Sequence, residues 1–176
     1  MRYEPTLEEQ ILSWPIDMSL AAFTPGSGYG PRQRLDAPPG EFEQHYALDI
    51  GAPEGTPVYA AARGVVDTAL AEDDPRAEPG GGHQVWLRHE GLNTGYHHLL
   101  EAPLVEWGDV VDAGTLLGYV GSSGSDGGPH VCFHVILTRG AQAIALNPRN
   151  ALRDYGDRTV VGPRGIQFTH PRQELP

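Results

Sequence analysis

The sequence contains no lysine, and its 12 lysine-or-arginine positions are all arginine. Enzymes that form a Schiff base through a lysine amine are therefore excluded, as are carriers that hold biotin or lipoate covalently on a lysine. The second exclusion is informative because Val110–Gly124, which reads VVDAGTLLGYVGSSG, resembles the turn-rich half of such a carrier. Without a lysine to modify, that interpretation of the segment fails.

Cysteine and basic charge are also scarce. Cys132 is the single cysteine, so the chain has no internal disulfide, and its cysteine content does not identify a compartment. The 23 acidic residues outnumber the 12 basic ones and give a formal net charge of −11. Because contact with phosphates requires a basic face, we expect no nucleic-acid partner and no binding to an anionic membrane.

Long apolar runs are missing as well. No stretch approaches the length that a membrane span needs, so no membrane span is expected. Residues Met1–Gln10 carry acids and no apolar run, so we expect no signal peptide there. Both a cytoplasmic protein and a mature form that has lost its leader agree with this pattern, and the oligomeric state stays open.

Glycine and proline are plentiful, at 23 and 16 of 176 residues, which favours turns and short strands. We expect one domain over residues 1–176, with its core at about 15–152, an N-terminal arm and a C-terminal tail. The closely spaced apolar segments predict a mostly β fold, an antiparallel sheet, sandwich or barrel with few short helices. Strands are expected at 57–60, 64–70, 84–89, 96–100 and 130–137. A turn is expected at 91–95, loops at 21–40 and 72–82, a helix or strand at 7–20, and a helical turn at 149–155.

The most informative stretch is Gly121–Leu137, GSSGSDGGPHVCFHVIL. After a Gly-rich loop that ends at Pro129, apolar residues alternate with His130, Cys132 and His134. Because successive side chains of a strand point to opposite faces, one face is expected to enter the core while the other presents imidazole, thiol and imidazole. Residues two apart on one face are about 7 Å apart, so neighbours in this row can converge on one ion or substrate.

Histidine, carboxylate and thiolate are the ligand types that zinc takes, and a catalytic zinc keeps three protein ligands and one open position. The candidate ligands are His45, Asp49, His98, His130, Cys132 and His134. For the other polar and aromatic residues we expect structural roles. His97 should point away from the site because it alternates with His98. Surface or supporting positions are expected for His83, His89 and His170, packing for Tyr96, packing or a wall of the site for Trp86, and a turn for Asp126.

The order of these motifs resembles the lysostaphin-like zinc metallopeptidases, also called the LytM or M23 family. The resemblance is carried by His45-x-x-x-Asp49, Tyr96-x-His98-Leu99 and Gly128-Pro129-His130-x-Cys132, with GYGPR, GTPVYAAARGVV, WGDVVDAGTLLGYVGSSG and NPRNAL around them, over about Pro15–Leu152. It implies an antiparallel β fold with a groove, and hydrolysis of peptide bonds in bacterial peptidoglycan in the cell envelope or outside the cell. It also implies that His45 and Asp49 bind zinc, while His98 and His130 act as base or oxyanion stabilisers.

The chain departs from the family at one position, because Cys132 stands where the family has the histidine that is its third zinc ligand. A thiolate can bind zinc, but its charge should weaken the ion as a Lewis acid and reduce activity. Two alternatives are that His134 replaces Cys132 as ligand through a bulge in the strand, and that the metal is lost. The predicted function is therefore a zinc endopeptidase of peptidoglycan, and the alternative is a degenerate module that binds or activates cell-wall hydrolases.

Overall fold

The computed structural model describes residues 12–33, 38–125, 127–153, 160–161 and 167–168, which are predominantly β-structure. The helical elements are a 3-10 turn, η1 (Met18–Leu20), and one helix, α1 (Pro148–Arg153). The strands are β1 (Gly30–Gln33), β2 (Phe42–His45), β3 (Leu48–Gly51), β4 (Pro57–Tyr59), β5 (Gly64–Leu70), β6 (His83–Arg88), β7 (Leu92–Leu99), β8 (Val110–Val111), β9 (Leu116–Tyr119), β10 (His130–Arg139), β11 (Gln142–Leu146), β12 (Val160–Val161) and β13 (Gln167–Phe168). The expected mostly β, antiparallel fold with few short helices is confirmed.

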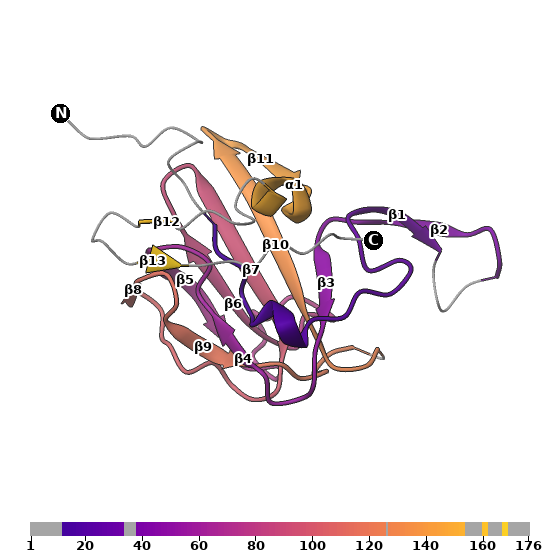
Figure 1. Ribbon diagram of the computed structural model, residues 1–176, viewed down its shortest axis with the longest axis horizontal. Coiled ribbons are helices and arrows are strands. Elements are labelled where there is room, and N and C mark those ends of the chain that lie inside the picture. The colour runs from indigo at the N-terminus through magenta and orange to yellow at the C-terminus, as the bar shows by residue number, and fades with distance from the viewer. Residues whose placement is uncertain (1–11, 34–37, 126, 154–159, 162–166, 169–176) are drawn as a thin grey trace.

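The main sheet is antiparallel and runs in the order β11-β10-β7-β6-β5-β8, with β3 paired to β10 as well. The long strand β10 lies next to one edge of this sheet, between β7 and the edge strands β3 and β11 (Figure 1). One edge of β10 pairs first with β3 and then with β11, and its other edge pairs with β7. The β1–β2 hairpin is a separate two-stranded sheet that extends to one side of the main sheet (Figure 1). Strand β10 therefore lies between β3, which carries Asp49, and β7, which carries Tyr96 and His98.

The alternation predicted for β10 is confirmed. Val131, Phe133 and Val135 have no exposed surface and join the hydrophobic core. The intervening residues, Cys132 among them, occupy the opposite face, as the period of a strand requires. The core thus fixes the register of β10 and thereby presents its polar face in a defined orientation.

Strands β2, β3, β8, β9 and β11 form where no strand was expected, and two further segments were expected to have another conformation. Residues 21–40 were expected to be loop, but β1 forms there and pairs with β2, Gly30 opposite His45. The turn expected at 91–95 is shorter, since β7 begins at Leu92 and pairs with β6 and β10 from its first residues. Both differences arise from pairing with strands distant in sequence, because main-chain hydrogen bonds stabilise residues whose local pattern is weak.

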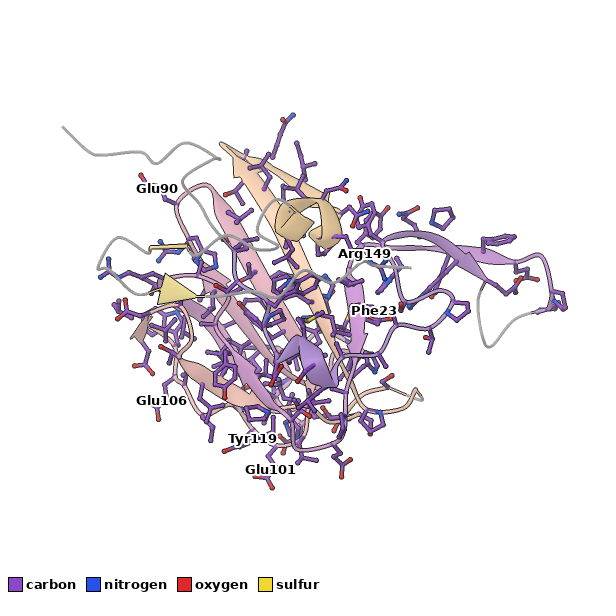
Figure 2. All side chains as sticks on the ribbon, viewed as in Figure 1. Phe23, Glu90, Glu101, Glu106, Tyr119 and Arg149 are labelled. Atoms are coloured by element: carbon purple, nitrogen blue, oxygen red, sulfur yellow. The ribbon has the colours of Figure 1, made fainter. Side chains whose placement is uncertain are left out.

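The helical and terminal expectations are met in part. Helix α1 overlaps the helical turn expected at 149–155, and η1 lies in the region expected to be helix or strand. Arg149 of α1 lies over the ring of Phe23, 4.6 Å from its centroid (Figure 2). Residues 7–11 and most of the expected C-terminal tail lie outside the described residues. Within the part of the chain that the structure describes, no helix is long and apolar enough to span a membrane.

Tyr96 of β7 is fully buried, as expected for a packing residue. Its hydroxyl oxygen accepts a hydrogen bond from the Ala61 N–H at 2.8 Å. Tyr96→Phe should lower the free energy of unfolding by about 1–3 kcal/mol, because a buried N–H loses its acceptor. Urea denaturation measures this, with Tyr119→Phe at the periphery as the control (Figure 2). Unchanged stability would contradict this structural role of the Tyr96 hydroxyl.

Candidate metal centre

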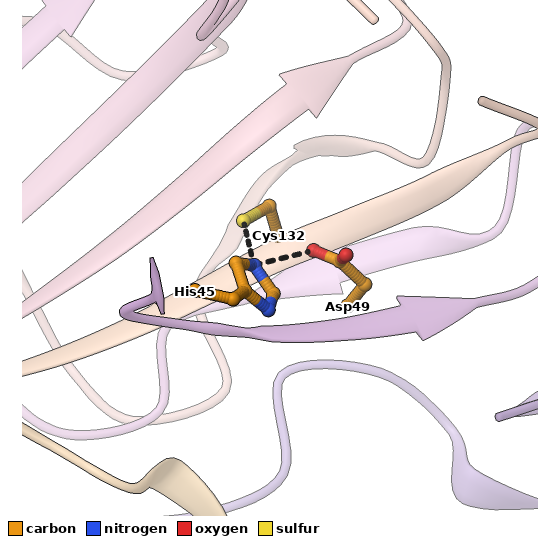
Figure 3. Close-up of side chains that lie close together, drawn as sticks. All are labelled: His45, Asp49 and Cys132. Atoms are coloured by element: carbon orange, nitrogen blue, oxygen red, sulfur yellow. Dashed lines mark hydrogen bonds and ion pairs between the residues drawn. The ribbon is translucent and has the colours of Figure 1, made fainter. Parts of the chain in front are cut away.

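Three segments bring together His45, Asp49 and Cys132 (Figure 3). His45 is the last residue of β2 and is buried, and Asp49 lies four residues further, in β3. Cys132 of β10 is the direct cross-strand partner of Asp49, so both side chains project from the same face of the sheet. The structure therefore assembles the set of residues that the sequence predicted as metal ligands.

The separations of the donor atoms fit a tetrahedral ion. His45 Nε2 lies 3.3 Å from Asp49 Oδ1 and 3.7 Å from Cys132 Sγ. Ligand distances of about 2.0–2.3 Å at tetrahedral angles place pairs of donors roughly 3.3–3.8 Å apart. All three donor atoms lie within 4.8 Å of one another. The two separations measured from His45 Nε2 thus lie within the range expected for ligands of one tetrahedral ion.

Hydrogen bonds to the backbone orient the imidazoles. Nδ1 of His45 lies 2.9 Å from the Gly28 carbonyl oxygen, and Nδ1 of His98 lies 2.8 Å from that of Ser123. His130 repeats the arrangement with the carbonyl of Gly128, also at 2.8 Å. Because a carbonyl oxygen only accepts, each Nδ1 carries a proton, so Nε2 is the ring nitrogen that remains for a metal or a reacting group. A metal or a reacting group therefore meets Nε2 in all three residues.

The pKa values of the Asp49 carboxyl and the Cys132 thiol are shifted in opposite directions. Burial by itself would raise the pKa of Asp49, but the hydrogen bond and charge of His45 outweigh it and hold that pKa well below its usual value. Burial raises the pKa of the Cys132 thiol, and the neighbouring Asp49 carboxylate raises it further. Cys132 thus needs a cation to become a thiolate, and metal binding here must release the thiol proton.

His98 and His130 lie next to the three candidate ligands. Their ring centroids are 4.6 Å apart, and His130 Nε2 lies 3.8 Å from Asp49 Oδ1. His98 has a φ of 62°, a left-handed backbone conformation that non-glycine residues rarely adopt. Its N–H donates to the Gly81 carbonyl, and its Nδ1–H donates to the Ser123 carbonyl. These two contacts fix His98 from both backbone and side chain, and they offset the strain.

The loops that hold His98 pack through glycines. A Cβ on Gly124 would lie 2.4 Å from the backbone nitrogen of Gly82, so only glycine permits this approach. Ser123 Oγ donates to the Leu99 carbonyl and accepts from the His83 N–H, which ties the two loops together. The Gly-rich composition of 121–128 therefore serves to place a carbonyl against His98.

The expectation that His97 points away from the site is wrong. His97 is the cross-strand partner of Cys132, and its ring lies 4.6 Å from His134 and 6.2 Å from His98. The left-handed φ of His98 breaks the alternation of β7, so adjacent histidines reach the same side. Burial lowers the pKa of His97 to about 2, with a further contribution from His134, so this imidazole is neutral.

His134 lies beside the candidate ligands without belonging to their group. β10 keeps a continuous register with β3 and β7, so the bulge that would let His134 replace Cys132 is not observed. His134 Nε2 lies 3.5 Å from Cys132 Sγ, and its ring packs 5.2 Å from Trp86, which is thus a wall of the site. Burial lowers the pKa of His134 to about 4.

One residue at the site was not anticipated from the sequence. Arg32 of β1 contacts Asp49, with Nη1 2.8 Å from Oδ2. The segment GYGPR belongs to the motifs that carry the family resemblance, but nothing in its local sequence indicates that its arginine reaches a carboxylate 17 positions away. Of the residues expected elsewhere, His83 and His89 bond to backbone outside the ligand group, while Asp126 and His170 lie outside the described residues.

Comparisons with known proteins agree with this architecture. Residues 43–148 match the family model described as peptidase family M23. The peptidoglycan DD-endopeptidase ShyC of Vibrio cholerae serotype O1 is 31% identical over 144 residues, which are 81% of this chain and 30% of ShyC. Lysostaphin of Staphylococcus simulans is 31% identical over 132 residues, which are 74% of this chain and 25% of that protein. The chain thus spans less than a third of either curated relative.

A solved structure shares the fold. The chain superposes on a zinc-containing peptidase from Vibrio cholerae with a TM-score of 0.63 and 26% sequence identity. The match covers 82% of this chain and 40% of that peptidase.

Proposed function

The chain belongs to peptidase family M23, and on this premise we propose that it is a zinc metalloendopeptidase that hydrolyses peptide bonds of bacterial peptidoglycan. The observation that carries the proposal is the convergence of His45 Nε2, Asp49 Oδ1 and Cys132 Sγ at separations suited to zinc. Support for the substrate comes from ShyC, a peptidoglycan endopeptidase. An envelope or extracellular location would follow from that substrate.

In this proposal His45, Asp49 and Cys132 hold the ion, and His98 and His130 stay free. A bound zinc would act as a Lewis acid, polarising the scissile carbonyl and lowering the pKa of a water. The rings of His98 and His130 lie 4.6 Å apart, and each binds a backbone carbonyl through Nδ1, which leaves Nε2 for the reaction. Each can accept a proton from the attacking water or, once protonated, hydrogen-bond the oxyanion and pass the proton to the leaving amine.

The pKa of His98 is lowered chiefly by burial. Its imidazole is therefore neutral near pH 7, as a general base must be. Its fixed tautomer also means that it need not reorient before accepting a proton at Nε2. Positioning of this kind is what a catalytic histidine requires, and the strained backbone at φ 62° is consistent with it.

Metal content provides the direct test. We expect about one zinc ion per chain in protein reconstituted with zinc and freed of excess, and loss of that ion in Asp49→Ala and Cys132→Ala. Elemental analysis measures the content, and His83→Ala provides a control outside the ligand group. A crystal structure of the zinc-loaded protein with no ion within about 2.0–2.3 Å of the three donors contradicts the ligand assignment.

Metal content, measured together with cleavage and binding of purified peptidoglycan, separates the peptidase from a degenerate module on this fold. A chain that binds zinc and cleaves purified peptidoglycan supports the proposal. A chain that binds peptidoglycan but takes up no zinc, and cleaves nothing with zinc in excess, would be a binding or activating module instead. This comparison is necessary because Cys132 stands at the position where the family has a histidine as its third zinc ligand.

A further inference from the structure

Arg32 links the β1–β2 hairpin to the candidate metal centre through two carboxylates. Its Nε lies 2.6 Å from Glu43 Oε1, on the neighbouring strand of the hairpin, where the two residues are direct cross-strand partners. Its Nη1 lies 2.8 Å from Asp49 Oδ2, on β3. The guanidinium is therefore held at two points, and its side chain is only 30% exposed.

The contacts of Asp49 divide its two oxygens between different partners. Oδ2 accepts from Arg32, whereas Oδ1 faces the ring nitrogens of His45 at 3.3 Å and His130 at 3.8 Å. A carboxylate with one oxygen engaged by a guanidinium has the other available to an ion in a single orientation. Arg32 thus selects which oxygen is the ligand and restricts rotation of the carboxylate.

Charge gives Arg32 a second effect. A ligand set of Asp49 and a Cys132 thiolate carries two negative charges, which would make a complex with a divalent ion neutral. Arg32 adds a positive charge at Oδ2, the Asp49 oxygen that does not face His45. Glu43 offsets part of that charge, but its side chain is 42% exposed and therefore better screened by water.

We propose that Arg32 is a positioning residue of the metal centre, which holds Asp49 Oδ2 so that Oδ1 alone is presented to the ion. This inference rests on the proposed zinc site and extends it from the three ligands to a residue on another sheet. It makes the β1–β2 hairpin a functional part of the centre twice over, through His45 and through Arg32.

The test measures zinc affinity of the apoprotein, by competition with a chromophoric chelator. Arg32→Gln should weaken zinc binding by about 10- to 100-fold, the usual effect of removing a hydrogen-bond partner from a metal ligand. Arg32→Lys should show a smaller loss, because it keeps the charge but not the planar fork. Arg88→Gln is the matched control, since it removes the same charge from an exposed pair with Asp67.

The possible results are distinct. Weaker zinc binding in Arg32→Gln, partial recovery in Arg32→Lys and no change in Arg88→Gln support the inference. Wild-type affinity in both Arg32 variants overturns it, and if KM for peptidoglycan rises in these variants at saturating zinc, Arg32 contacts substrate instead. If Arg32→Gln does not fold, as judged by circular dichroism, Arg32→Lys carries the decision. A wild-type protein that takes up no zinc refutes the proposed metal site itself, separately from the role of Arg32.

Discussion

His98→Ala and His130→Ala are each expected to lower hydrolysis of purified peptidoglycan by about 10²-fold or more while zinc content stays at the wild-type level. Both imidazoles have their Nδ1 bound to a carbonyl, which leaves Nε2 for a reacting group, and Nε2 of His130 lies 3.8 Å from Asp49 Oδ1. Their rings lie 4.6 Å apart beside the three candidate ligands. Removing either leaves the ion held but takes away a group that moves a proton or stabilises the oxyanion.

Rates are measured at saturating zinc, so that a change in metal affinity does not imitate a change in catalysis. The control is His83→Ala, because the wild-type His83 ring lies outside the site, where its Nδ1 accepts a hydrogen bond from the Glu72 N–H. A variant such as His98→Gln keeps a polar side chain but not a base, and it should be as impaired as His98→Ala. Loss of zinc in His98→Ala would show that His98 is a ligand, and full activity in both alanine variants would refute the catalytic assignment.

Cys132→His is expected to increase hydrolysis, because it replaces a negative ligand by a neutral one. With His45 and Asp49 unchanged, the complex with zinc changes from neutral to a net charge of +1. The ion then withdraws more electron density from a bound carbonyl and acts as a stronger Lewis acid. The comparison requires both proteins, with and without added zinc, on the same peptidoglycan preparation, and Cys132→Ala as the variant that lacks any third ligand.

Oxidation gives an independent readout of the same residue. An oxidised sulfur is a poor ligand, so peroxide should release zinc from the wild-type protein but not from Cys132→His. Activity in the wild-type protein that Cys132→His abolishes would defeat this reasoning, since the cysteine would then be a specialised ligand or a nucleophile. His134 Nε2 at 3.5 Å from Sγ supplies a base for a nucleophile. Burial raises the pKa of Cys132, however, and this disfavours the reactive thiolate.

The candidate ligands could be predicted from the sequence because each lies in a short motif whose geometry is local. His45 and Asp49 are separated by three residues, and Cys132 belongs to a strand whose apolar partners alternate strictly. The burial of Val131 and Phe133 decides which face of β10 carries the thiol, and a period of two is legible without a structure. The family resemblance then joined motifs that lie far apart along the chain.

The loops and the first hairpin were predicted less well, for an identifiable reason. β1 has no apolar alternation of its own and forms because β2 pairs with it. The first residues of β7 resemble a turn but lie between β6 and β10. Local patterns report local preferences, whereas these residues owe their conformation to hydrogen bonds with strands elsewhere in the sequence.

By itself, the sequence determined the chemistry of the site: the histidine, carboxylate and thiol types, their order along the chain, and the face of β10 on which Cys132 lies. Only the tertiary structure decided how these groups are supported. It turned His97 inward through the left-handed backbone of His98, bound three Nδ1 atoms to carbonyls, and placed Arg32 on Asp49. Such contacts depend on loops that pack against one another through space, so no spacing along the chain encodes them.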